Sequence, residues 1–221
     1  MNSKKLIIFD MDGTLIDSVP DLALSVNLTL EKLNKQTFPI DIIKTWVGNG
    51  AKILIARALS GDINIDKNLT QDEILSTLDI FLDIYRQNLT TTTTIYPDVK
   101  EILEVLEDRY ILAVATNKPE EFVKPILKGM GIFEYFDCVV GANDTLEKKP
   151  SPKPLEYICN RYDVDVTDAV MVGDSKNDIL AANRANIDSI AVSYGYNHNE
   201  DISLYNPTII IDNFKELLQI L

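Results

Sequence analysis

The stretch LIIFDMDGT at residues 6–14 decides how the rest of the chain is interpreted. Its first four residues form a continuous apolar run, which is typical of a parallel strand buried on both faces. Asp10 and Asp12 follow directly, and Gly13 then allows the backbone to turn sharply. Open α/β sheets bind ligands at the carboxyl ends of their strands. The stretch therefore predicts an α/β fold with a site at the end of its first strand.

Similar apolar runs recur along the chain and alternate with helix-period segments. We expect strands at residues 6–9, 111–115, 138–140, 169–172, 190–192 and 208–211. We expect helices between the later strands at residues 99–106, 120–128, 154–162 and 177–183. This alternation predicts a Rossmann-like, doubly wound parallel sheet.

Residues 17–85 break the alternation, because their pattern is helical and no convincing strand divides it. We therefore expect an inserted α-helical cap domain over residues 17–85 and a core made of residues 1–16 and 86–221. Pro20 begins the first cap helix. Its expected apolar face consists of Leu24, Leu28 and residues 30–33. The threonine run at residues 90–94 is expected to be a solvated connector.

Composition limits the possible partners. The 221 residues include 21 Lys and Arg against 34 Asp and Glu, for a net charge of −13. With 46% hydrophobic residues the chain is globular, and its acidity argues against nucleic acid and membrane surfaces as partners. The expected partner is a small phosphorylated metabolite. We expect a cytoplasmic monomer or homodimer with no membrane span.

Histidine and cysteine usage excludes two common kinds of metal site. His198 is the single histidine, so no zinc site can draw two imidazoles from one chain. Cys138 and Cys159 lack CxxC spacing and are expected to be small buried side chains.

Asp10 and Asp12 lie two residues apart, so an extended chain places both side chains on one side. Two carboxylates repel each other by about 4 kcal/mol at a separation of about 4 Å near a protein surface. A divalent cation on the pair, or a proton on one member, relieves this repulsion. Both conditions suit phosphoryl transfer by a metal-bound nucleophile beside a general acid/base. Taken alone, the pair could also be turn-forming carboxylates.

Three further polar segments follow or lie near predicted strand ends. In GDSKND, residues 173–178, Asp174 and Asp178 offer oxygen ligands that suit Mg²⁺; the same segment also has the residues of a capped helix start. Thr116 and Asn117 follow another strand and offer donors to phosphate oxygens. Lys149, which precedes a proline, supplies the cation that an acidic site needs.

In this order, the segments FDMDGT, ATNK, KKPSP and GDSKND resemble the four motifs of the haloacid-dehalogenase-like superfamily of Mg²⁺-dependent phosphohydrolases. The helical insertion resembles the cap of that superfamily's first cap class. The resemblance implies that Asp10 attacks phosphorus to form an aspartyl-phosphate. It implies that Asp12 protonates the leaving alkoxide and then activates water, while Thr116 and Lys149 hold the phosphoryl oxygens.

The same resemblance implies a metal site and a supporting residue. Asp10, the backbone carbonyl of Asp12 and Asp174 would bind Mg²⁺. Asp178 would orient metal-bound water or Lys149.

The cap segment WVGNGAK, residues 46–52, resembles that of the bacterial phosphoglycolate phosphatases, as does DSVPDL at residues 17–22. This resemblance implies hydrolysis of 2-phosphoglycolate to glycolate and phosphate. We hypothesise that the loop at Gly48, Asn49 and Gly50, with Arg57 or Lys52 nearby, receives the carboxylate of the leaving group. From spacing alone, a plain helix–helix turn is equally compatible with this loop.

Other functions remain open at this point. The chain could hydrolyse another small phosphoester, or act as a phosphoglucomutase-type phosphotransferase on the same four motifs. A non-catalytic binding module is disfavoured, because nucleophile, acid/base, cation and metal carboxylate are all present. His198 is expected to be a surface residue, and Trp46 to pack within the cap.

Overall fold

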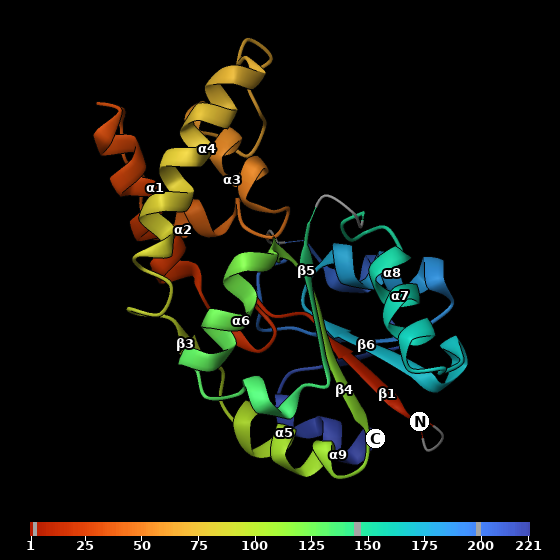
Figure 1. Cartoon of the computed structure of the whole chain (residues 1–221). Coiled ribbons are helices and arrows are strands. Elements are labelled where there is room, and N and C mark those ends of the chain that lie inside the picture. The colour runs from red at the N-terminus through yellow and green to blue at the C-terminus, as the bar shows by residue number, and fades with distance from the viewer. Residues whose placement is uncertain (2–3, 144–146, 198–199) are drawn as a thin grey trace.

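A six-stranded parallel sheet forms the centre of the protein (Figure 1). The computed structural model describes residues 1, 4–143, 147–197 and 200–221, so His198 lies outside the described residues. In sheet order the strands are β5 (Cys138–Ala142), β4 (Ile111–Pro119), β1 (Leu6–Phe9), β6 (Ala169–Gly173), β7 (Asp188–Val192) and β8 (Ile209–Ile211). Every neighbouring pair is parallel, which confirms the expected doubly wound α/β fold.

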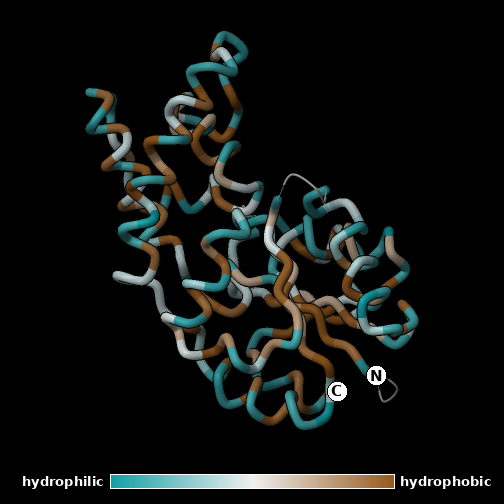
Figure 2. The backbone as a smooth tube through the Cα atoms, in the orientation of Figure 1, coloured by the Kyte–Doolittle hydropathy of each residue, from teal (hydrophilic) through white to brown (hydrophobic). Residues whose placement is uncertain are grey.

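Each face of the sheet is covered by helices, as the continuous apolar runs require. Alternation along β1 places Ile7 and Phe9 in one core cluster and Leu6 and Ile8 in the other. The first cluster includes residues of α5 (Val99–Glu107), α6 (Glu120–Gly129) and α9 (Leu217–Ile220). The second includes residues of α7 (Lys153–Arg161) and α8 (Lys176–Ala185). Figure 2 accordingly shows the strands as the most hydrophobic part of the chain.

Both cysteines are free and buried, as expected. Short 3-10 helices lie in the described connections, at η1 (Phe133–Tyr135), η2 (Val166–Asp168), η3 (Ile202–Tyr205) and η4 (Phe214–Glu216). None of the described helices combines the length and the apolar character that a bilayer crossing requires.

The first four helices of the chain lie beyond the carboxyl edge of the sheet (Figure 1). They are α1 (Val19–Lys32), α2 (Ile40–Lys44), α3 (Ala51–Ser60) and α4 (Gln71–Arg86). They pack on one another, with α4 against both α1 and α3. We call this group the cap helices. Trp46 is buried among them, with its ring 5.1 Å from that of Phe38.

The buried face of α1 differs from the expected one. Leu24 and Leu28 are 40% and 38% exposed, whereas Leu22, Val26 and Leu30 are buried. The helix is apolar on more than one side, and its buried side also carries three polar residues. They are Asp21, Ser25 and Thr29. Because of these polar residues, the buried face of α1 cannot be recognised from its hydrophobicity pattern alone.

The expectation of a solvated threonine connector holds for Thr90–Thr92 and Thr94, which are exposed, and is wrong for Thr93. Asp21 accepts hydrogen bonds from the backbone N–H and the hydroxyl of both Thr92 and Thr93, at 2.6–3.0 Å, and Thr93 is buried. Next to this contact, β2 (Ile16–Asp17) pairs antiparallel with β3 (Thr94–Ile95). The chain therefore enters and leaves the cap helices along two segments that are bonded to each other.

Candidate active site

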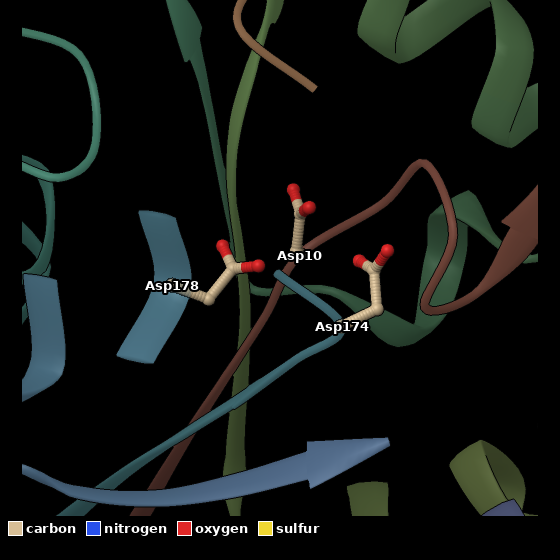
Figure 3. Close-up of side chains that lie close together, drawn as sticks. All are labelled: Asp10, Asp174 and Asp178. Carbon is tan, nitrogen blue, oxygen red and sulfur yellow. The ribbon is translucent and has the colours of Figure 1, made fainter. Parts of the chain in front are cut away.

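Three buried carboxylates meet at the carboxyl edge of the sheet (Figure 3). Asp10 follows β1, and Asp174 follows the neighbouring strand β6. Asp178 reaches the same place from the first turn of α8. One oxygen from each lies within 4.8 Å of the others. Parallel strands end at the same edge, so residues more than 160 positions apart become neighbours.

The negative charges of these three carboxylates repel one another strongly unless a cation lies beside them. Burial raises the pKa of Asp10 to about 7; the charge of Lys149 opposes this rise and that of Asp178 adds to it. Burial, Asp178 and Asp10 raise the pKa of Asp174 well above its ordinary range. Asp10 Oδ1 is buried, and its close polar contact is the ammonium group of Lys149 at 2.9 Å. Three buried carboxylates that each bring an oxygen to one place form an all-oxygen donor set, which fits a hard divalent cation such as Mg²⁺.

Asp174 and Asp178 are held in place by their neighbours. Thr14 Oγ1 donates to Asp174 Oδ1 at 2.9 Å, and the backbone N–H of Tyr196 donates to Asp174 Oδ2 at 2.6 Å. Asp178 Oδ2 accepts from the N–H and the hydroxyl of Ser175, which is the N-cap of α8. The expected helix start and the acidic cluster therefore coexist in one segment.

Lys149 is the cation at the centre of the site. It is buried, and its Nζ lies 2.6 Å from Asp178 Oδ1 and 2.9 Å from Asp10 Oδ1. Nζ also donates to the carbonyl of Ala115 at the end of the central part of β4. Burial lowers the pKa of Lys149, but Asp10 and Asp178 outweigh it and raise the pKa above its usual range. The lysine is therefore charged and directed at the acidic trio.

The pairing register between β4 and β5 changes just after Ala115, and this change orients the residues that follow. The pairing of β4 with β5 shifts between Ala115 and Pro119, so that residues 116–118 leave the regular ladder. Such irregularities redirect side chains at sheet edges. Thr116, Asn117 and Lys118 all line the pocket beside Asp10. The expected strand ended at residue 115, whereas β4 continues through Pro119.

Asp12 stands apart from the acidic trio. Its carboxylate accepts a hydrogen bond from Ser18 Oγ and lies 3.1 Å from Lys118 Nζ. Sequence reasoning missed both partners. Lys118 could have been found, because it ends the ATNK segment two residues after Thr116. Nothing in the sequence pattern marks Ser18 as a partner of Asp12.

The cap loop at residues 48–50 closes over the core. The carbonyl of Gly48 accepts hydrogen bonds from Asn117 Nδ2 at 3.3 Å and from Asn177 Nδ2 at 3.1 Å. Gly48 and Gly50 line the pocket. A Cβ at Gly50 would lie 3.3 Å from the carbonyl oxygen of Asn117, and Gly50 has a φ of +86°, so the close approach favours glycine.

Asn49 and Arg57 act within the cap. Arg57 donates to the carbonyl of Trp46 at 2.7 Å, to Asn49 Oδ1 at 3.1 Å and to the carbonyl of Ile63 at 3.1 Å. Neither Arg57 nor Asn49 is among the described residues that line the pocket. Lys52 is exposed. The structure thus brings Gly48 and Gly50 to the pocket that Asp10 and Asp178 also line, whereas the Arg57 guanidinium binds the backbone of the cap.

A pocket lies between the cap helices and the core. Its core wall carries Asp10, Asp12, Thr116 and Lys149. Its cap wall is largely apolar and includes Leu22, Val47, Leu54, Phe81 and Tyr85. The pocket therefore has a charged wall on the core and an apolar wall on the cap.

Comparison with known proteins agrees with this geometry. Residues 7–192 match the family model described as haloacid dehalogenase-like hydrolase. The chain belongs to this family. The resemblance expected from the four motifs is thereby confirmed, and a cap beside a parallel α/β core is the architecture that haloacid dehalogenase-like membership implies.

Several members of this family resemble the chain over its whole length. A phosphoglycolate phosphatase of Colwellia psychrerythraea is 50% identical, over 99% of this chain and 97% of that protein. One from Haemophilus influenzae is 44% identical over 100% of both chains. The crystal structure of a predicted phosphoglycolate phosphatase from Haemophilus somnus superposes with a TM-score of 0.91 at 40% identity, covering 100% of this chain and 99% of that one.

Proposed function

We propose that the protein is a Mg²⁺-dependent phosphatase of small phosphate monoesters that hydrolyses 2-phosphoglycolate to glycolate and phosphate. The observation that carries the proposal is the meeting of Asp10, Lys149 and the Asp174–Asp178 pair at one pocket. The names of the full-length relatives support the choice of substrate.

In the proposed reaction, a carboxylate oxygen of Asp10 attacks phosphorus as the bond to the ester oxygen breaks. Asp12 gives its proton to the departing alkoxide, which leaves as glycolate with a neutral hydroxyl. Water then attacks the phosphorus of the aspartyl-phosphate and loses a proton to Asp12. The P–O bond to Asp10 breaks, which regenerates the carboxylate and releases phosphate.

The other residues bind and orient the phosphoryl group. Thr116, Asn117 and Lys149 would hold its oxygens, and Lys149 is already charged and fixed by two carboxylates. Asp10, the Asp12 carbonyl and Asp174 would hold Mg²⁺, with Asp178 fixing Lys149 beside it. When bound, the ion neutralises the carboxylates and stabilises charge on the transferring phosphoryl group.

The cap would select the leaving group and exclude water. Gly48 and Gly50 close the pocket through their loop, and Arg57 and Asn49 would contribute by fixing that loop. Exclusion of water strengthens the electrostatic contacts inside the pocket.

A phosphate-release screen over small phosphoesters in the presence of Mg²⁺ tests the proposal. We expect 2-phosphoglycolate to give the highest kcat/KM and Asp10→Asn to release no phosphate while remaining folded by circular dichroism. Conversion of one sugar phosphate to another without phosphate release would instead identify a phosphotransferase. Full activity of Asp10→Asn would overturn the mechanism.

A further inference from the structure

We infer that Lys118 of the core and Tyr85 of the cap together form a subsite for a carboxylate on the leaving group, placed one carbon away from the ester oxygen. The inference rests on the proposed phosphatase function and deepens it, because it assigns the residues that distinguish an acidic leaving group from a neutral one.

Lys118 is a charged group that lies inside the pocket. Only 3% of its side chain is exposed, and its Nζ lies 3.1 Å from both oxygens of Asp12. Burial lowers the pKa of Lys118, but Asp12 and Tyr85 raise it above its usual range. An ammonium group has three N–H donors. Two of these donors are directed at the Asp12 oxygens and the third is shared with Tyr85, where an anion would contact both residues.

Lys118 is also the pocket cation that the proposed mechanism does not assign to the phosphoryl group. Among the described residues that line the pocket, the cations are Lys118 and Lys149. Lys149 is occupied by Asp10, Asp178 and the carbonyl of Ala115, on the side where phosphorus would sit. Lys118 instead contacts Asp12, the proposed acid/base that protonates the leaving group.

Tyr85 supplies the second observation. It is 1% exposed; its hydroxyl oxygen interacts with the Lys118 ammonium, and its O–H proton is donated to no described residue. Burial raises its pKa to about 12, against the opposing charge of Lys118, so the hydroxyl keeps its proton. A buried hydroxyl proton without an acceptor carries a desolvation penalty. A ligand that accepts a hydrogen bond at this position removes that cost.

The Tyr85 ring is held firmly by its surroundings. It stacks on Phe81 with ring centroids 5.5 Å apart and meets Phe122 edge-on at 5.2 Å. Lys118 Nζ lies 4.8 Å from the centre of the same ring. The cation and the hydroxyl therefore reach the pocket on fixed side chains from two different parts of the chain.

The spacing suits a short acidic alcohol. Asp12 must contact the ester oxygen to protonate it, and Lys118 contacts Asp12. In 2-phosphoglycolate a single carbon separates the ester oxygen from the carboxylate. When Asp12 contacts the ester oxygen, the carboxylate therefore lies close to Lys118, which contacts Asp12. Leu22, Leu54 and Phe122 also line the pocket, and apolar surroundings strengthen a charge-assisted hydrogen bond.

The test compares two esters that share a two-carbon alcohol, 2-phosphoglycolate and ethyl phosphate. The readout is the ratio of their kcat/KM values in the wild type and in Lys118→Met, Tyr85→Phe and Lys124→Met. Lys124 is an exposed lysine on α6 and serves as the matched control. Tyr85→Phe keeps the ring stacking, so it remains informative if Lys118→Met does not fold.

We expect Lys118→Met to reduce the preference for 2-phosphoglycolate about 100-fold and Tyr85→Phe to reduce it about fivefold, as for the loss of a charged and a neutral hydrogen bond. Lys124→Met should leave the ratio unchanged. If Lys118 only positions Asp12, both esters lose activity equally, and the unchanged ratio overturns the inference alone. A wild type that releases phosphate from neither ester overturns the proposed function, and one that prefers neither ester overturns the carboxylate subsite.

Discussion

Lys149 and Asp178 form an ion pair of 2.6 Å in which the side chains are only 2% and 0% exposed. A buried pair of this kind adds little net stability, but removing one partner leaves a buried charge uncompensated. Because Lys149 also contacts Asp10, a single side chain links Asp10, the proposed nucleophile, to helix α8, which begins beside the acidic trio.

Replacement of this lysine is therefore expected to affect both folding and catalysis. Lys149→Met should lower the free energy of unfolding by about 3 kcal/mol and reduce kcat/KM by at least about 100-fold. Urea unfolding and phosphate release measure the two effects. Lys153→Met, which breaks an exposed ion pair with Glu147, should change stability by less than about 1 kcal/mol. Equal effects of the two substitutions would contradict the structural role of the buried pair.

Metal removal tests the oxygen-ligand site. We expect EDTA to abolish phosphate release and Mg²⁺ to restore it, whereas Zn²⁺ alone should not, because the site offers neither histidine nor thiolate. Mg²⁺ at about 100 times its Kd should also stabilise the wild type by about 2.7 kcal/mol. This stabilisation should disappear in Asp174→Asn and persist in Asp108→Asn, whose site is exposed on the core. Undiminished stabilisation of Asp174→Asn would place the ion elsewhere.

The hydrogen bond between Asn177 and the carbonyl of Gly48 joins core to cap. Loss of one neutral hydrogen bond costs about 1 kcal/mol, so Asn177→Ala should raise KM about fivefold with a smaller change in kcat. Steady-state kinetics measure this split, and Asn160→Ala on an exposed face of α7 is the control. A fall in kcat at constant KM would instead place Asn177 in the chemical step.

The contact of Asp21 with the threonine connector predicts a pH-dependent stability. Burial opposes the ionisation of Asp21, but the hydrogen bonds from Thr92 and Thr93 prevail and lower its pKa. A carboxylate whose pKa is lowered in the folded protein stabilises the fold at pH values above its ordinary pKa. This stabilisation is lost as the pH falls. Asp21→Asn should therefore lower the free energy of unfolding by about 2 kcal/mol at neutral pH.

The difference from the wild type should narrow as the pH falls below about 4, the ordinary pKa of an aspartate. Denaturant unfolding across this range measures it, with Asp41→Asn at an exposed position as the control. A difference that stays constant with pH would show that Asp21 acts through packing alone.

The core and its catalytic edge could be predicted because their signals are local. Leu6–Phe9 is apolar throughout since both faces of β1 are covered. Asp10 and Asp174 follow their strands directly, and parallel topology brings them together. The partners of Asp12 could not be predicted in the same way. They depend on side-chain directions after the register shift in β4 and at the start of the cap.

The cap was harder to predict, because its elements are short or apolar on several sides. Helix α2 has five residues and begins after Pro39, which is too short for a hydrophobic period to be visible. The pairing of β2 with β3 involves two residues from each segment, and their partnership is set by the folded chain. Tyr85 became significant only through its position beside Lys118, across the boundary between cap and core.

The two-stranded junction of Ile16–Asp17 with Thr94–Ile95 has an evolutionary consequence. Residues can be inserted, deleted or exchanged between these anchor points without shifting the register of any strand in the main sheet. Gene segments that encode different lids can therefore be recombined onto the unchanged sheet edge that carries Asp10 and Asp174, with Ser18 and Gly48 exchanged along with the lid. A lineage can thus acquire a new preference for alcohols while it inherits its phosphorus chemistry intact.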